Sequence, residues 1–162
     1  MTTENLLSSK NPDISVVIPC LNEEDTLGLC LSKLKTVAQE EDFSIEVIVA
    51  DNGSQDSSID IASEFRTRVV HVARKGYGAA LMEGIEKSRA PFVLMADADD
   101  SYDFLELPKF FHKLQEGFDL VQGCRLPKGG GKIAKGAMPW SHRHIGNPLF
   151  TFLVRNMFTF GN

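Results

Sequence analysis

Short apolar runs alternate along this chain with longer segments in which apolar residues recur at helical spacing. The runs are typical of strands covered on both faces of a sheet, and they lie at residues 14–19, 45–50, 68–72, 92–96 and 119–123. The segments between them predict helices at residues 24–37, 56–65, 78–87 and 104–115. This alternation predicts an α/β fold with a mainly parallel sheet and helices on both of its faces.

The composition is that of a globular domain, but the charge is divided unevenly along the chain. Hydrophobic residues make up 43% and charged residues 24% of the 162 positions, which is enough for a sizeable core. Residues 120–162 hold six of the 17 Lys and Arg residues and none of the 22 Asp and Glu residues. A basic C-terminal segment favours a polyanionic partner such as a phosphate, a lipid headgroup or a nucleic acid.

Two features of the sequence favour a cytoplasmic protein. Residues 1–13 lack a basic start and a long apolar stretch, so we interpret them as a polar tail and not as a secretory signal. The three cysteines, Cys20, Cys30 and Cys124, have no close pairing, and they predict neither a disulfide framework nor a zinc site.

Four aspartates follow the strand predicted at residues 92–96, and they are Asp97, Asp99, Asp100 and Asp103. Carboxylates this close repel one another, so the arrangement costs stability unless a cation lies among them. The acidic run therefore predicts a bound metal or a basic partner.

Polar clusters follow all of the predicted strands. Because the carboxyl ends of parallel strands meet at one edge of a sheet, we expect these clusters to form one site. The clusters contribute Asn22, Glu23, Asp51, Asn52, Gly76, Gly78, Asp97, Asp99 and Arg125.

Three known kinds of site contain comparable acidic or glycine-rich motifs. A calcium loop starting at Asp97 would need Gly sixth and Glu twelfth, where this chain has Tyr102 and Pro108. A dinucleotide fingerprint would need a final Gly where "GYGAAL" has Leu81, and it would follow the first strand. A phosphatase with Asp97 as nucleophile stays open, although such a motif normally follows the first strand.

The motifs "VVIPCLNEEDTL", "VIVADNGSQDSS", "RKGYGAALMEGI", "LMADADDSY" and "VQGCR" occur in this order between Ile14 and Arg125. Together they resemble the inverting glycosyltransferases of the GT-A fold, particularly the dolichyl-phosphate mannosyltransferase-like and other polyprenyl-phosphate enzymes. The resemblance implies a GT-A (Rossmann-like) fold. It also implies transfer of a sugar from a nucleotide-diphosphate sugar to a polyprenyl or dolichyl phosphate, with Mg²⁺ or Mn²⁺ as cofactor and no nucleic-acid partner.

The resemblance also implies roles for particular residues. The residues implied to hold the nucleotide sugar are Pro19, Leu21, Asn22, Glu23, Asp51, Asn52, Asp97, Ala98 and Arg125, with Arg125 facing the diphosphate. Asn52 stands where the family usually has a second Asp. Asp97 and Asp99 form the Asp-x-Asp motif and are the implied catalytic and metal-binding residues, with Asp99 as the metal ligand and Asp97 beside the metal or on the ribose. Asp100 and Asp103 either support the metal site or begin the next helix, where negative charge is favourable.

The acceptor side is predicted from the basic segment. A phosphate monoester is already largely ionised at neutral pH, so it needs positioning and positive charge more than a general base. The residues predicted to bind the acceptor phosphate are Lys128, Lys132, Lys135 and Arg143.

The predicted organisation has four parts: a polar tail at residues 1–13, a donor-binding core at 14–125, a basic glycine-rich loop at 126–147 and an apolar helix at 148–162. The last part is shorter than the roughly 20 residues that cross a bilayer. We expect it to pack on a missing part of the protein, on a second subunit or at the cytoplasmic membrane surface. The family's enzymes continue further, so a truncated chain is expected, and a non-catalytic remnant that binds nucleotide sugar is the alternative.

Overall fold

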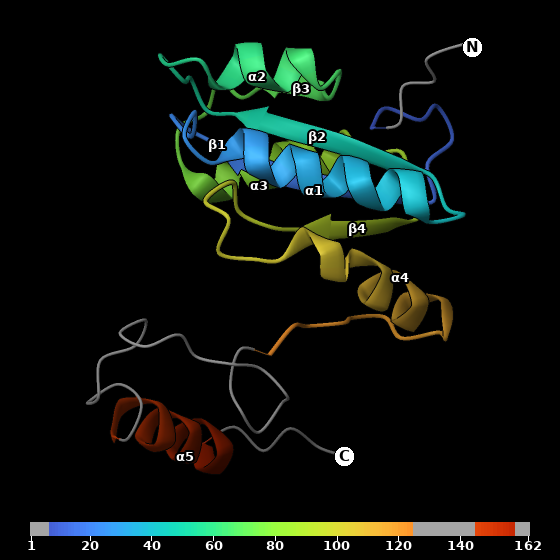
Figure 1. Ribbon diagram of the computed structural model, residues 1–162. Coiled ribbons are helices and arrows are strands. Elements are labelled where there is room, and N and C mark those ends of the chain that lie inside the picture. The colour runs from blue at the N-terminus through green and yellow to red at the C-terminus, as the bar shows by residue number, and fades with distance from the viewer. Residues whose placement is uncertain (1–6, 125–144, 158–162) are drawn as a thin grey trace. The chain divides into compact units, whose positions relative to one another are not determined.

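The computed structural model describes residues 7–124 and 145–157, in two compact units, Met1–Val121 and Gln122–Asn162 (Figure 1). The first unit contains the strands β1 (Ile14–Cys20), β2 (Ile45–Asp51), β3 (Arg68–His71) and β4 (Phe92–Met95). Its helices are α1 (Leu27–Glu40), α2 (Ser58–Glu64), α3 (Tyr77–Glu86) and α4 (Leu107–Gln115), with the short 3-10 helix η1 (Phe104–Glu106) before α4. The described part of the second unit contains α5 (Asn147–Met157).

The sheet has the strand order β3-β2-β1-β4, and all of its strand pairs are parallel. Helices α1 and α3 lie on opposite faces of it (Figure 1). Every residue of β1 and β2 is buried, which is why both strands are nearly continuous apolar runs. The predicted α/β fold with a parallel sheet is confirmed.

The two faces of the sheet are packed differently. On the α1 face, Val16 and Val47 pack in one large cluster with Leu31 of α1. On the α3 face, a Cβ added at Gly84 would lie 2.4 Å from Cγ1 of Val17, so the α3 backbone sits almost directly on β1. The absence of a side chain at Gly84 therefore sets how closely α3 approaches the sheet.

The N-terminal segment differs from the prediction at residues 7–9. The backbone N–H of Val47 donates to the carbonyl of Leu7 (2.9 Å), and the Leu7 side chain is buried. Because β3 pairs only with residues 48–51 of β2, the first half of β2 has backbone groups left to satisfy, and residues 7–9 satisfy part of them. The predicted polar tail over residues 1–13 is therefore wrong for residues 7–9.

The predicted fifth strand at residues 119–123 is absent from the structure, which assigns no strand there. A strand needs a neighbour for its backbone groups, and no described segment pairs with this one. Its Leu120 side chain is 78% exposed. An apolar run of five residues is too short for its pattern alone to separate a strand from an extended loop.

The helix α5 carries large apolar side chains that are exposed, among them Leu149, Phe150 and Phe152. It begins one residue before the predicted start at Pro148. Within residues 7–124 and 145–157, no helix combines the length and the apolar character needed to cross a membrane.

A buried ion cluster joins the strands at the end of the sheet opposite the predicted site. The side chain of Glu46 is fully buried, and it accepts hydrogen bonds from Ser15 (2.8 Å), Arg68 (3.0 Å) and Arg89 (2.7 Å). Burial alone would raise the pKa of Glu46, but these hydrogen bonds outweigh it and hold the pKa below its ordinary value. Glu46 therefore stays ionised in the core.

Replacing Glu46 with Gln should lower the free energy of unfolding by about 2 to 4 kcal/mol at pH 7, because two arginines lose their buried counter-charge. The expected loss is below that of a fully buried pair, since both arginines are partly exposed. Urea denaturation measures it, with exposed Glu40→Gln as the matched control. Because the pKa of Glu46 is lowered in the folded state, ionised Glu46 stabilises the fold at neutral pH. This stabilisation is lost as the pH falls below 4.5 towards the folded pKa. Equal stability of Glu46→Gln and wild type at pH 7 would contradict this role.

Candidate active site

The loops that follow β1 and β2 are joined by reciprocal hydrogen bonds. The backbone N–H of Asn22 donates to Ser54 Oγ (3.1 Å), and the backbone N–H of Gln55 donates to Asn22 Oδ1 (2.8 Å). Asn22 has a φ of 58°, in the left-handed region that Asn tolerates better than most residues. The backbone N–H of Glu23 donates to Ser58 Oγ (2.9 Å) and extends the join to α2. The two loops therefore form one wall of the candidate site.

Asp51 lies at the carboxyl end of β2, directly opposite Cys20 of β1. Its carboxylate accepts a hydrogen bond from the backbone N–H of Ser54 (2.8 Å), and Nδ1 of His71 lies 3.2 Å from its other oxygen. Burial would raise the pKa of Asp51, but the hydrogen bonds from Ser54 and His71 outweigh it and lower the pKa. Asp51 is therefore an ionised carboxylate fixed in place at the sheet edge.

Asn52 is buried, and its side-chain amide is used within the protein. Its Nδ2 donates to the carbonyls of Val72 (3.3 Å) and Arg74 (2.9 Å), and its Oδ1 accepts from the backbone N–H of Gly76 (2.7 Å). An Asp here could accept from Gly76 but could not donate to the two carbonyls. The departure from the family's usual Asp therefore has a structural reason, since Asn52 holds the segment after β3.

Asp97 follows β4 and receives a hydrogen bond from the start of α3. The phenol of Tyr77 donates to Asp97 Oδ1 (2.8 Å), and this bond, together with partial burial, raises the pKa of Tyr77 to about 12. The phenol thus stays protonated across the physiological range. Asp97 keeps its other oxygen for a ligand.

Asp99 is exposed, and hydrogen bonds within its own turn orient its carboxylate. Hydrogen bonds from the Ser101 side chain and backbone, including one of 2.9 Å from the backbone N–H, lower the pKa of Asp99. Between the two carboxylates, Ala98 is buried, and its carbonyl accepts from Sγ of Cys30 in α1 (3.4 Å). The Asp-x-Asp motif is thus held between α1 and α3, with Asp99 turned outward.

The other two aspartates of the acidic run have partners of their own. Nζ of Lys33 lies 2.8 Å from Asp100 and 3.7 Å from Asp103. Asp103 also caps η1, because its carboxylate accepts from the backbone N–H of Leu105 (3.2 Å). The structure therefore separates the run into a pair that lies beside Lys33 and a pair, Asp97 and Asp99, that has no cationic partner among the described residues.

The paired carboxylates fit a hard divalent cation that arrives with a ligand. Mg²⁺ usually takes one or two protein carboxylates and completes its shell with phosphate oxygens and water. Asp97 accepts a hydrogen bond at Oδ1 from Tyr77, and Asp99 accepts one at Oδ1 from the backbone N–H of Ser101. Within the described residues, no group of three or more His, Cys, Asp or Glu side chains is arranged to hold a metal by itself. A cation bound by Asp97 and Asp99 would therefore need donors beyond those that the described residues group there.

The remaining predicted residues differ in how far the structure places them. Pro19 is buried in β1 opposite Ala50, and Leu21 is half exposed in the loop that follows. The predicted diphosphate residue Arg125 and the predicted acceptor residues Lys128, Lys132, Lys135 and Arg143 lie outside the described residues.

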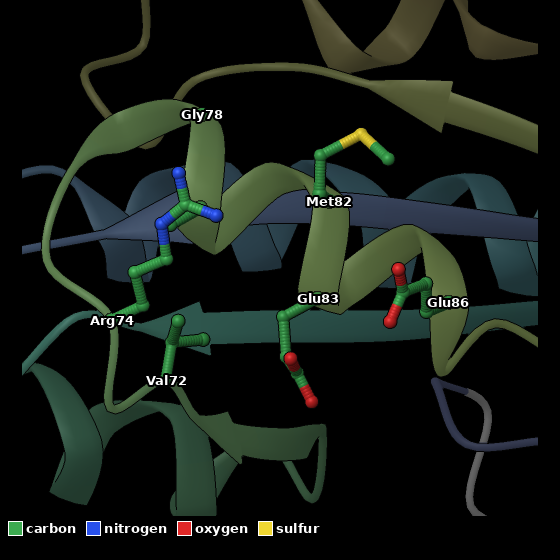
Figure 2. A pocket seen from close by; sticks show the side chains of 7 residues that line it. Val72, Arg74, Gly78, Met82, Glu83 and Glu86 are labelled. Atoms are coloured by element: carbon green, nitrogen blue, oxygen red, sulfur yellow. The ribbon is translucent and has the colours of Figure 1, made fainter.

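A separate pocket of about 220 Å³ opens beside α3; its lining includes Gly78 of the predicted clusters but none of the residues implied to hold the nucleotide sugar or the metal. Figure 2 shows Arg74, from the segment after β3, near Gly78, while Glu83 and Glu86 project from α3. The pocket is smaller than the roughly 300 Å³ at which ligand sites usually begin, and two carboxylates in its lining disfavour an anion. It is therefore a poor candidate for a nucleotide site.

Sequence reasoning missed two residues of the site, Tyr77 and Lys33. Tyr77 lies between Gly76 and Gly78 in a motif that was noted for its glycines alone, and an exposed aromatic residue at a helix start was the available signal. Lys33 pairs with an aspartate 67 positions away, and nothing local marks it.

Solved structures that share this fold include glycosyltransferases. One is glucosyl-3-phosphoglycerate synthase of Mycobacterium tuberculosis in complex with Mn²⁺, uridine-diphosphate-glucose and phosphoglyceric acid. It is 29% identical with a TM-score of 0.56, and the match covers 65% of this chain and 40% of that one. The fold is therefore that of a GT-A glycosyltransferase, as the motifs predicted.

The family model described as glycosyl transferase family 2 matches residues 15–159, and this chain belongs to that family. A low-salt glycan biosynthesis hexosyltransferase of Haloferax volcanii is 40% identical over 152 residues, which are 91% of this chain and 36% of that protein. A dolichyl-phosphate hexose transferase of Haloferax volcanii is 34% identical over 117 residues, which are 72% of this chain and 50% of that protein. The chain spans about a third to three-fifths of the length of several of the curated relatives that it matches.

Replacing Asn52 with Asp should lower the free energy of unfolding by about 1 to 3 kcal/mol, because two carbonyls lose their donors and face a carboxylate instead. The matched control is Gln55→Glu, the same amide-to-acid change at an exposed position of the same loop. Chemical denaturation of both variants at pH 7 compares them. Equal stability of the two would show that the Asn52 amide does not hold the loop after β3.

Proposed function

We propose that this chain forms the donor-binding part of a metal-dependent, inverting glycosyltransferase that moves a sugar from a nucleotide-diphosphate sugar to a polyprenyl phosphate. The observation that carries the proposal is that Asp97 and Asp99, each oriented by a hydrogen bond, follow the carboxyl end of β4. Membership of glycosyl transferase family 2 supports this reading over a phosphatase with Asp97 as nucleophile.

The residues of the proposed site have distinct roles. Asp51 and the wall formed by the loops after β1 and β2, which includes Asn22 and Glu23, would receive the nucleoside. Asp97 and Asp99 would hold the Mg²⁺ or Mn²⁺. That cation would neutralise the charge that develops on the departing nucleoside diphosphate, an effect worth several kcal/mol. Asn52 would contribute by holding the segment after β3 and not by contacting the ribose.

The donor is proposed to be a uridine-diphosphate sugar and the acceptor a lipid phosphate. A structural relative binds uridine-diphosphate-glucose with Mn²⁺, and a sequence relative is named for transfer to dolichyl phosphate. That structural relative also holds a small phosphorylated acid, so a phosphate-bearing acceptor is common to both. The six basic residues of positions 120–162, with no acidic residue among them, suit such an acceptor at a membrane surface.

Asp99→Asn should remove most of the Mn²⁺-dependent gain in affinity for uridine diphosphate, at least tenfold, because the outward-facing metal ligand loses its charge. Isothermal titration calorimetry with and without Mn²⁺ measures this gain. The matched control is Asp100→Asn, since Asn tolerates the left-handed backbone at that position (φ 56°) and Asp100 is paired with Lys33. A normal Mn²⁺-dependent gain in Asp99→Asn would overturn the metal assignment.

Replacing Lys128, Lys132 and Lys135 together with Ala should raise the KM for a polyprenyl phosphate roughly ten- to hundredfold and leave nucleotide affinity unchanged, because each lysine near an anionic surface contributes about 1 kcal/mol. The matched control removes three lysines of the first unit, Lys35, Lys109 and Lys113. Sugar transfer is assayed with a polyprenyl phosphate in vesicles and, separately, with glycerol 3-phosphate. Equal loss of acceptor use and nucleotide binding, or equal use of the two acceptors, would contradict the lipid-phosphate proposal.

A further inference from the structure

The segment between β3 and α3 connects two strand ends that do not pair with each other. Strand β1 lies between β2 and β4 in the sheet, so no backbone hydrogen bond joins the ends of β2 and β4. At the β2 side, Asn52 binds Gly76 through its Oδ1 (2.7 Å), and Nζ of Lys75 donates to the Asn52 carbonyl (2.6 Å). At the β4 side, the next residue, Tyr77, donates to Asp97 (2.8 Å). Residues 75–77 therefore bridge Asn52 to Asp97.

The bridge begins at the buried, hydrogen-bonded Asn52 and ends at the exposed phenol of Tyr77. Asn52 is only 5% exposed, and its amide also holds the Val72 and Arg74 carbonyls, so the backbone leading to Gly76 is anchored in the fold. Tyr77 is 60% exposed, so its ring contributes little to the core. Its phenol is instead placed where it meets a carboxylate of the Asp-x-Asp motif.

The contact limits what Asp97 can do. A carboxylate on a loop can rotate about two side-chain torsions, and a hydrogen bond from a fixed donor restricts that rotation. With Oδ1 held by Tyr77, Asp97 offers its other oxygen to a ligand. Asp99 is restricted in the same way by Ser101.

We propose that Tyr77 is a positioning residue of the donor site, whose phenol holds Asp97 so that Asp97 and Asp99 bind one divalent cation through one oxygen each. The inference rests on the proposed function, in which these two aspartates hold the metal. The anchor of Tyr77 is the Asn52 bridge, so the residue that departs from the family's usual Asp supports the metal site from a distance.

The test measures Mn²⁺ binding directly in Tyr77→Phe, which keeps the ring and removes only the hydroxyl. Electron paramagnetic resonance reports the concentration of free Mn²⁺ and so gives the Kd for Mn²⁺ in the presence of saturating uridine diphosphate. Calorimetry gives the Kd for uridine diphosphate without metal, and thermal melting gives the Tm of the unliganded chain. The control is Tyr102→Phe at the second of the chain's two tyrosines.

In Tyr77→Phe we expect the Kd for Mn²⁺ to rise roughly tenfold, the lower end of what a hydrogen bond to a charged group contributes. The metal-free Kd for uridine diphosphate and the Tm should match wild type, and Tyr102→Phe should match wild type throughout. An unchanged Kd for Mn²⁺ in Tyr77→Phe would overturn the inference. A loss of metal-free affinity for uridine diphosphate would show that Tyr77 contacts the nucleotide. A lower Tm would show that the role of Tyr77 is structural. Either result would also overturn the inference. If the wild-type chain shows no metal-dependent binding, the proposed function fails first and the inference fails with it.

Discussion

The parallel pairing of β1 with both β2 and β4 is the constraint on which the rest of the structure depends. Because all three strands run the same way, the loops after them open at one edge, and the β1–β2 register sets Asp51 beside Cys20 at that edge. The buried Glu46 cluster joins β1, β2 and β3 at the other end of the sheet. Both faces must then be covered, which α1 and α3 do, and the close approach at Gly84 brings α3 down onto the sheet with Tyr77 at its first position.

Hydrogen bonds and one lysine explain how the chain accommodates four aspartates in seven positions. Lys33 from α1 lies beside Asp100 and Asp103, and the latter also caps the helix that follows. Asp97 and Asp99 receive neutral donors, a phenol and the Ser101 groups, which orient them without cancelling their charge. Repulsion therefore remains, and at Asp97 and Asp99 a divalent cation bound with a diphosphate would relieve it.

Local pattern was enough to predict the parallel sheet, its four described strands and the polar residues that follow β1, β2 and β4, because burial on both faces and helical spacing can be recognised in short windows of sequence. It failed where the outcome depended on distant partners. Residues 7–9 looked like a polar tail because the half of β2 that they pair with is more than 30 positions away. The run at 119–123 has the apolar pattern of a strand, but no described segment pairs with it, and the pattern alone could not reveal this. Asn52 looked like an altered ligand, and only the carbonyls of Val72 and Arg74 reveal why an amide is needed.

The most direct test of the account is a thermal melt of the 162-residue chain against uridine and guanosine diphosphates and their sugars, each with and without Mn²⁺. Selective binding to the native state raises the Tm, so the account predicts a cooperative melt that a uridine diphosphate raises more strongly with Mn²⁺ than without it. A cooperative melt that ignores every nucleotide, with or without Mn²⁺, would contradict the central claim that Asp97 and Asp99 form a metal-dependent donor site.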